Sequence, residues 1–574
     1  MKTQKNLTHL LLLLFVINTS LSSAQTTEPV IQKGYFRNPM NIPISLSANF
    51  GELRNNHWHM GLDIRTQQRE NLPVHAAADG YVSRVSVAPF GFGQCIYITH
   101  PNGYTTVYGH INTFYPALDQ YVKNAQYANE SWAIDLRPEP GQFPVKKGQF
   151  IANSGNTGGS QGPHLHFEIR ETVSEKCVNP LLFGFAEADA IPPVITRLAL
   201  YDRSKGLYEQ APRLVSVIKP KTGGITTNPA VIQTPFSMVS LAIGATDRTN
   251  ISSGPNGIYS ASLKFDGRVI SLFVHDKIGY DETLYLNAQI DYRYRTLGGA
   301  YLQHLSRLPG DDGPAPRFAP GEGIIQLKDT LRHSIEIEVR DHNGNKTILR
   351  SSIQYKPGAV TLPALMGEKF PPGHISVFER PGFEAVIREG SLYDTIRAMY
   401  KRTESFPTGA VSALHQFGDR ATPIHERVTI QIQPDRPIPD ALRDKLVVKR
   451  VTGKNDEIEK VTWIRERLQF TTRYFGSFQL FIDTTAPVLN APGKGKEIDL
   501  RKASAIVFRP RDNFDEIRNF RAELDGKWLR FTNDKGRSFI YRFDEHCGPG
   551  KHTLKVEVED FVGNRTVGEW VIIR

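Results

Sequence analysis

The feature that most constrains how this chain can fold is the spacing of its apolar residues. Runs of five to eight residues, rich in β-branched and aromatic side chains, alternate with turn signals along the sequence. In the first third of the chain these runs lie at 80–87, 94–100, 104–110 and 164–170. A helical spacing is hard to find except around 117–129. The sequence therefore predicts a mainly β protein with antiparallel sheets.

The rear of the chain contains an internal repeat. The segment HSIEIEVRDHNGNKT at 333–347 matches HTLKVEVEDFVGNRT at 552–566. Each copy predicts an alternating strand, then an aspartate, then a Gly-Asn turn that starts another strand. Upstream of each copy lies an Asp-Gly turn, and further upstream a Pro-Val pair. We therefore expect two copies of one β-sandwich module.

This repeat divides the chain into units. The two copies predict β-sandwich modules at 189–358 and 485–574, which resemble the immunoglobulin-like modules common in secreted bacterial proteins. Residues 359–484 between them are predicted to form another β-rich module. The histidine-rich residues 25–188 form a separate front domain, predicted to be a small antiparallel β-sheet domain.

The N-terminus predicts a secretory signal peptide at 1–24. Two lysines precede an apolar run at 10–17 that is too short to span a membrane, and Ser22 and Ala24 supply the small residues of a cleavage site. No cysteine follows this run and no apolar anchor ends the chain. We therefore expect a soluble protein exported across the inner membrane to the periplasm or the cell exterior.

Composition excludes several classes of protein. Hydrophobic residues make up 40% of the 574 positions, enough for packed cores, and after the N-terminus no apolar run reaches the roughly 18 residues of a membrane helix. Three cysteines are too few for a disulfide scaffold or a four-cysteine zinc site, although Cys95 and Cys177 can pair within one domain. The formal charge of +10, or +8 without the two lysines of the signal peptide, fits anionic partners in general. We expect no nucleic-acid partner.

Seven of the 17 histidines fall between His57 and His166, and two short motifs stand out among them. The first is HMGLD at 59–63 and the second is HLH at 164–166, which follows a glycine-rich turn. Positions i and i+2 of a strand share a face, so His164 and His166 can point into one site. Two imidazoles and one carboxylate suit a catalytic Zn²⁺ and leave one coordination position for water.

A longer series of motifs resembles the lysostaphin-type zinc metallopeptidases, which cut peptide crosslinks in bacterial cell walls. The likeness covers about residues 45–185. It is carried by HMGLDI at 59–64, VHAAADG at 74–80, GFG at 91–93, HPNG at 100–103, YGH at 108–110, GNTG at 155–158 and GPHLHFE at 162–168.

The resemblance implies roles for five residues. His59, Asp63 and His166 would bind Zn²⁺, and His110 and His164 would lie beside the metal. Zinc and these two histidines would activate a water molecule, one imidazole taking its proton and the other stabilising the oxyanion. The sequence does not say which histidine does which. No HExxH segment is present to supply a glutamate base.

Other candidates keep two interpretations. Glu168 either orients a ligand histidine or is a buried partner of another side chain, and His57 is either a spare ligand or a partly exposed residue near the groove. His75 and His100 are expected to be structural. The extra stretch at 114–143 forms a groove wall, a lid or a surface excursion.

From these observations we expect a secreted zinc endopeptidase that hydrolyses the peptide crosslinks of peptidoglycan. The rear modules would position it on the envelope or bind an envelope protein. The alternative, from another functional class, is a catalytically silent envelope adaptor, or a regulator of other cell-wall hydrolases, that uses this fold for binding. A third interpretation keeps the enzyme and makes the substrate a protein or a glycine-rich peptide.

Overall fold

The computed structural model describes residues 30–574 except 186–188, 251–253, 314–320, 359–364, 454–455, 496, 515–516 and 537. The predicted signal peptide at 1–24 lies outside the described residues. Strands dominate the described chain, which confirms the mainly β prediction. None of the helices that the structure describes has the length and apolar character needed to cross a membrane.

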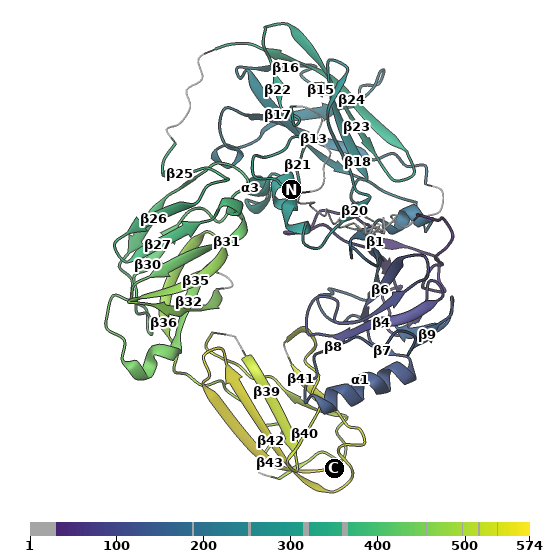
Figure 1. The fold of residues 1–574 in the computed structure, drawn as a ribbon, viewed down its shortest axis with the longest axis vertical. Coiled ribbons are helices and arrows are strands. Elements are labelled where there is room, and N and C mark those ends of the chain that lie inside the picture. Colours follow the sequence, from purple (N-terminus) through teal and green to yellow (C-terminus); the bar gives the residue numbers. More distant parts are fainter. Residues whose placement is uncertain are drawn as a thin grey trace, which may run out of the picture.

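Four β-rich units follow one another around a closed loop, with the last unit beside the first (Figure 1). We call them the front domain (30–185), the second module (189–358), the third module (365–484) and the fourth module (485–574). This division keeps the boundaries predicted from the sequence.

The front domain is built on one antiparallel sheet with the strand order β1–β2–β11–β6–β5–β4–β8. Its strands are β1 (Leu46–Ala48), β2 (Leu62–Arg65), β4 (Gly80–Val87), β5 (Gln94–Thr99), β6 (Tyr104–Ile111), β8 (Ile134–Leu136) and β11 (His164–Glu171), with β9 (Pro144–Val145) beside β4 and β12 (Cys177–Val178) beside β11. The four runs predicted as strands are β4, β5, β6 and β11, so these predictions are confirmed. Strand β6 is buried along its whole length, as expected for a strand covered on both faces.

A smaller sheet and one helix pack into the same core. The sheet has the order β3–β10–β7, with β3 (Pro73–His75), β7 (Thr113–Phe114) and β10 (Phe150–Asn153). Helix α1 (Pro116–Ala128) begins with a proline, whose fixed φ suits the first helical turn. Leu118, Val122 and Gln126 are buried along one face of α1 because residues four apart lie above one another. The predicted helix around 117–129 is confirmed.

The second module consists of two sheets that pack around one apolar core. The first sheet has the order β15–β14–β13–β17–β21 with β22 beside β17, and the second β16–β24–β23–β18–β19. The strands are β13 (Val194–Asp202), β14 (Arg213–Ile218), β15 (Thr226–Asn228), β16 (Val231–Thr234), β17 (Met238–Thr246), β18 (Ser260–Phe265), β19 (Arg268–Val274), β20 (Lys277–Ile278), β21 (Gln303–His304), β22 (Ile325–Gln326), β23 (Arg332–Arg340) and β24 (Lys346–Tyr355). The short helices are α2 (Leu286–Gln289) and α3 (Tyr292–Thr296).

The third module has two larger sheets, β26–β27–β31–β35–β34 and β29–β30–β36–β32–β33, and the pair β25–β28. The strands are β25 (Glu368–Phe370), β26 (Ser376–Arg380), β27 (Phe383–Ile387), β28 (Ile396–Ala398), β29 (Tyr400–Thr403), β30 (Leu414–Phe417), β31 (Pro423–Ile432), β32 (Leu446–Val451), β33 (Glu457–Lys460), β34 (Thr462–Ile464), β35 (Arg467–Tyr474) and β36 (Gly476–Ile482).

The fourth module has the sheets β37–β43–β42–β39–β40 and β38–β41. The strands are β37 (Glu497–Asp499), β38 (Ala505–Phe508), β39 (Ile517–Leu524), β40 (Lys527–Trp528), β41 (Phe539–Arg542), β42 (Lys551–Asp560) and β43 (Arg565–Ile573). The sequence repeat recurs as structure, because β42 and β43 pair as β23 and β24 do in the second module. His333 and His552 lie at matching strand starts and bond to the aspartates of the Asp-Gly turns, Asp266 and Asp525, as expected for structural residues.

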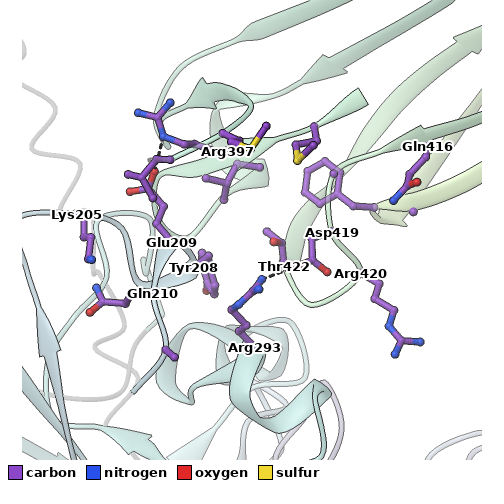
Figure 2. A pocket seen from close by; sticks show the side chains of 18 of the residues that line it. Lys205, Tyr208, Glu209, Gln210, Arg293, Arg397, Gln416, Asp419, Arg420 and Thr422 are labelled. Carbon is purple, nitrogen blue, oxygen red and sulfur yellow. Dashed lines mark hydrogen bonds and ion pairs between the residues drawn. The ribbon is translucent and has the colours of Figure 1, made fainter. Parts of the chain in front are cut away.

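Apolar contacts join each unit to the next along the chain. Trp58 of the front domain shares a cluster with Ile278 of the second module, whose strand β20 also pairs with β12 of the front domain. One core continues from the second module into the third, beside a cavity of about 1010 Å³. Figure 2 shows that cavity, where Arg293 faces Asp419 and Arg397 faces Glu209 in ion pairs. A further cluster joins the third module to the fourth.

The fourth module closes the loop against the front domain. Tyr127 of α1 stacks on His546 with 3.9 Å between ring centroids and meets Trp528 edge-on at 5.3 Å. Arg530 donates to the Gln126 side chain at 3.1 Å. Helix α1 therefore supports the fourth module. The structure describes all of residues 114–143, and none of them lines the groove described below.

We expect Tyr127→Ala to open the closed loop. The substitution removes both ring contacts while leaving polar contacts at the edge, so the radius of gyration measured by small-angle X-ray scattering should increase. Tyr127→Phe keeps the ring and serves as the matched control, with a scattering profile like that of the unmodified protein. An unchanged profile for Tyr127→Ala would show that the aromatic contact does not hold the loop closed.

Candidate metal centre

Strand pairing brings the predicted site residues together. Strands β2 and β11 are antiparallel neighbours, and their register places Asp63 directly opposite His166. His164 lies two residues before His166 on β11, so both side chains project from the same face of the sheet. His59 precedes β2 by a tight turn in which a Cβ on Gly61 would lie 2.4 Å from the Phe167 carbonyl oxygen. Only glycine fits there, which explains its place in the HMGLD motif.

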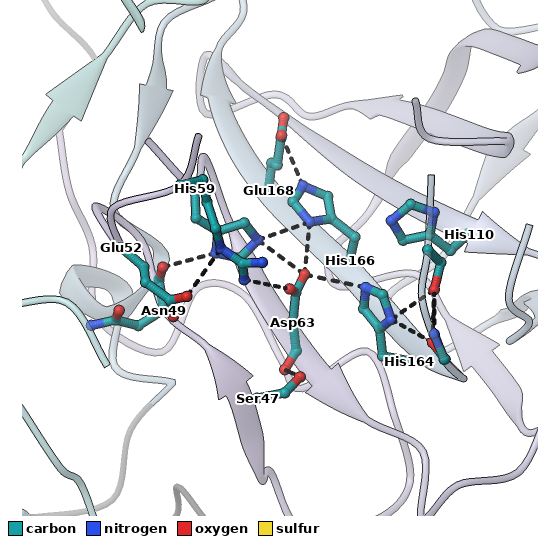
Figure 3. Close-up of polar contacts among 12 residues, drawn as sticks. Ser47, Asn49, Glu52, His59, Asp63, His110, His164, His166 and Glu168 are labelled. Atoms are coloured by element: carbon teal, nitrogen blue, oxygen red, sulfur yellow. Dashed lines mark hydrogen bonds and ion pairs between the residues drawn. The ribbon is translucent and has the colours of Figure 1, made fainter. Parts of the chain in front are cut away.

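Three ligand atoms converge in this cluster (Figure 3). His59 Nε2 lies 3.0 Å from Asp63 Oδ1, His166 Nδ1 lies 2.9 Å from the same oxygen, and the two ring nitrogens are 3.2 Å apart. Ligands at about 2.0–2.1 Å from a tetrahedral metal ion are roughly 3.3 Å from one another. The three residues are buried and can bind a metal ion with little rearrangement.

Hydrogen bonds fix which nitrogen each ring presents. His59 Nδ1 donates to the Asn49 carbonyl oxygen at 2.8 Å, which leaves Nε2 free for a ligand. His166 Nε2 donates to Glu168 Oε1 at 2.9 Å, which leaves Nδ1 free. Carboxylates and carbonyls that hold a histidine in this way raise its affinity for a metal.

Glu168 belongs to a wider buried network. Arg170 Nε donates to Glu168 Oε2 at 2.7 Å, and the Tyr280 hydroxyl donates to Oε1. Burial alone would raise the pKa of Glu168, but Arg170 and His166 lower it to about 2. The side chain is therefore ionised at neutral pH and holds His166 in one orientation, which favours the first of its two interpretations.

The electrostatics of the cluster favour a cation. Burial would lower the pKa of His166, but hydrogen bonds to Asp63 and Glu168 raise it to about 9. Burial would likewise raise the pKa of Asp63, yet the surrounding histidines hold it well below its usual value. Two ionised carboxylates thus flank one imidazole, and positive charge between them is stabilised.

The remaining two histidines lie beside the cluster. His110 Nδ1 donates to the Thr157 carbonyl oxygen and His164 Nδ1 to that of Gly162, both at 2.8 Å. The ring centroids of His110 and His164 are 4.7 Å apart, and His164 Nε2 lies 3.4 Å from Asp63 Oδ1. Burial, with His166 and His164 adding, lowers the pKa of His110 to about 3, so its ring is neutral with Nε2 unprotonated.

The backbone at His110 is unusual for a histidine. Its φ is +61°, in the left-handed region that side chains with a Cβ rarely adopt. Such a conformation costs of order 1 kcal/mol and persists where the surrounding contacts enforce it. Here the backbone N–H of His110 donates to Phe92 and the ring donates to Thr157, so contacts on both sides aim the side chain at the cluster.

The cluster lies in an open groove of about 890 Å³. Gly91 and Phe92 line one part of the wall, and the segment 159–164 lines another. Loops of the fourth module contact residues just before both parts, because Lys535 N donates to the Pro89 carbonyl oxygen and Gly158 N donates to Asp534 Oδ1. Tyr280 of the second module also lines the groove.

The structure brings all five predicted site residues together in one groove. His57 is exposed on the groove lining, and His100 is buried against Asp79 and Thr106, as its structural interpretation requires. Cys95 and Cys177 are buried free thiols and do not pair. Sequence reasoning missed Tyr280, because nothing in its local sequence marks a residue 112 positions after Glu168 as its partner.

Comparisons with known proteins match two parts of the chain. Residues 57–131 and 133–180 match the model of peptidase family M23, and residues 368–483 match that of the Zu5-like domain. An uncharacterized metalloprotease of Haemophilus influenzae is 34% identical over 155 residues, 26% of this chain and 27% of that protein. The DD-carboxypeptidase/endopeptidase Mpg of Neisseria meningitidis is 30% identical over 155 residues, 26% of this chain and 29% of that protein.

The matched region is a limited part of each molecule. The chain spans less than a third of the length of these curated relatives. Among solved structures, a zinc-containing peptidase from Vibrio cholerae is 26% identical, with a TM-score of 0.20, covering 27% of this chain and 41% of that one. The front domain, whose motifs resemble the lysostaphin type, is a peptidase family M23 domain.

Proposed function

We propose that this protein is an exported zinc endopeptidase that hydrolyses the peptide crosslinks of peptidoglycan. The observation that carries the proposal is the convergence of His59 Nε2, Asp63 Oδ1 and His166 Nδ1 beside two further histidines. Two imidazoles and one carboxylate match the donor sets of catalytic zinc sites that keep a position open. Relatives named as a metalloprotease and a DD-carboxypeptidase/endopeptidase support the reaction class.

A zinc ion held by these three residues would supply a Lewis acid that lowers the pKa of water and polarises a carbonyl group. The rest of the chemistry falls to the chain. His110 and His164 each use the Nδ1 proton in a bond to a backbone carbonyl, so Nε2 is the nitrogen of each ring that can exchange a proton. Either ring can accept a proton from water, and a ring protonated in this way can stabilise the oxyanion or protonate the leaving amine.

The groove fits an extended peptide better than a small metabolite. It is open to solvent, and its lining comes from strands and loops of the front domain with one tyrosine of the second module. The formal positive charge of the chain suits an anionic envelope. The predicted signal peptide would deliver the protein to the periplasm or the cell exterior, and the rear modules would hold it on the envelope or on a partner protein there.

The proposal is tested on crosslinked peptidoglycan. Zinc-loaded protein should release fragments whose masses, measured by liquid chromatography and mass spectrometry, identify the cleaved bond. Fragments from a protein or glycine-rich peptide but not from peptidoglycan would support the enzyme with another substrate. A protein that binds no zinc and releases no fragments would instead be the catalytically silent adaptor or regulator.

We expect His110→Ala to lower kcat by about 10²–10⁴-fold, because it removes one of the two rings able to move a proton. Zinc content, measured by mass spectrometry, should stay at the level of the unmodified protein, since the three converging ligand atoms belong to His59, Asp63 and His166 and not to His110. His374→Ala, an exposed histidine of the third module, is the matched control and should leave kcat unchanged. Undiminished turnover in His110→Ala would remove His110 from the mechanism.

Glu168→Gln should weaken zinc binding about 10–100-fold, because the carboxylate that orients His166 loses its charge. Competition with a chromogenic chelator measures the affinity. Glu171→Gln changes the same residue type on the same strand, where Glu171 pairs with Lys277 instead, and should leave zinc affinity unaltered. Equal affinities for the two variants would contradict an orienting role for Glu168.

A further inference from the structure

Outside the groove, buried or partly buried aspartates gather at two places in the rear of the chain. Each place holds three aspartates whose ligand oxygens all lie within 4.8 Å of one another. The first triad is Asp189, Asp247 and Asp341, and the second triad is Asp483, Asp512 and Asp560.

The two triads occupy equivalent positions of the repeat. In the second module Val194 pairs with Thr246 and the next residue is Asp247; in the fourth, Val488 pairs with Arg511 and the next residue is Asp512. Asp189 and Asp483 each stand four residues before the proline of the Pro-Val pair. Asp341 and Asp560 are the aspartates that precede the two Gly-Asn turns.

The same hydrogen bonds build both triads. Asp341 Oδ1 accepts from two backbone N–H groups of its turn at 2.9 Å, and Asn345 Nδ2 donates to Asp341 Oδ2 and to the Asp189 carbonyl oxygen at 2.7 Å. Asp560 Oδ1 accepts from the two corresponding N–H groups. Asn564 Nδ2 donates to Asp560 Oδ2 at 2.7 Å and to the Asp483 carbonyl oxygen at 3.2 Å. The Gly-Asn turns therefore hold the Asp341 and Asp560 carboxylates in the same orientation in the two modules.

Several oxygens of the triads have no partner among the described residues. Asp247 is 2% exposed and its Oδ1 accepts no hydrogen bond. Asp189 Oδ2 and Asp512 Oδ1 also accept none, although Asp512 as a whole is only partly buried. Asn256, 3% exposed, has no partner for either side-chain atom. Its backbone exchanges both hydrogen bonds with Asp247, so the two side chains lie on the same face. Asp247 Oδ1 and the Asn256 side chain thus lie on one face of this strand pair, and neither has a hydrogen-bond partner among the described residues.

Charge makes this arrangement unfavourable without a cation. Burial, with Asp341 and Asp189 adding, raises the pKa of Asp247 to about 7. Burial, with Asp483 and Asp560 adding, raises the pKa of Asp512 to about 6. The residue after Asp341 is His342, whose pKa is lowered by burial. The residue at the same place in the fourth module is a phenylalanine. Among the described residues, His342 has no cationic counterpart at the same place in the second triad.

We propose that each triad binds one calcium ion and ties the segment entering the module to two of its turns. Carboxylate, amide and carbonyl oxygens without nitrogen or sulfur are the ligands of a hard cation, and Ca²⁺ accepts irregular sets of them. Asp189 begins the second module and Asp483 follows β36, the last strand of the third module. The ions would therefore stiffen the junctions before the second and fourth modules.

The test uses the full chain, stripped of metals and reloaded with one equivalent of zinc. Calorimetric titration should show two equivalents of Ca²⁺ bound at concentrations up to about 1 mM, and thermal unfolding should move to a higher temperature. Asp247→Asn and Asp512→Asn should each remove one equivalent, whereas Asp440→Asn, at a 96% exposed side chain of the third module, should remove none. Zinc content should stay constant in all variants. A failure of calcium binding can therefore be distinguished from a failure of the proposed peptidase function.

The opposite outcomes overturn the proposal. If the aspartates of each triad instead share a proton, the unmodified protein binds no Ca²⁺ and shows no thermal shift. In that case Asp247→Asn replaces a protonated aspartate by an uncharged side chain. The temperature of thermal unfolding then equals or exceeds that of the unmodified protein. Binding of Mg²⁺ as tight as that of Ca²⁺ would overturn the choice of ion. Because the unmodified protein is titrated first, a variant that fails to fold does not decide the result.

Discussion

The register between β2 and β11 is the constraint on which the candidate site depends. It places Asp63 opposite His166, and the period of two along β11 puts His164, His166 and Glu168 on one face while Leu165, Phe167 and Ile169 enter the core. A slip of one residue would exchange these faces, burying the imidazoles and exposing the apolar side chains. The apolar core therefore enforces the register, and the register assembles the metal ligands.

Much of the site is predictable because its signals are local. Strands β4, β5, β6 and β11, helix α1 and the shared face of His164 and His166 all follow from spacing within a few residues. The long-range contacts are different in kind. Glu168 kept two interpretations from the sequence, since its partner Tyr280 lies in another module, and the Thr157 carbonyl that orients His110 has no side-chain signature. The support that α1 gives to the fourth module was hidden for the same reason.

The groove is bounded by more than the front domain. Tyr280 reaches Glu168 from the second module, on one side of the cluster. On the other side, the fourth module holds the loops at 89–93 and 155–160: Asp534 accepts from Gly158, and Lys535 donates to the carbonyl oxygens of Pro89 and Ser160. The second and fourth modules thus both contact groups that position or enclose the site. The shape of the groove therefore depends on the closed loop of the four units.

The contacts that close the loop differ from those that continue it. Apolar clusters join the front domain to the second module, the second to the third and the third to the fourth. The fourth module meets the front domain through rings at Tyr127, hydrogen bonds and an ion pair between Arg521 and Glu130. Exposed ion pairs contribute about 0–1 kcal/mol, and burial of an apolar side chain contributes about 1.5–3 kcal/mol. If the loop opens, it therefore opens at this contact, where the loops that line the groove are released with it.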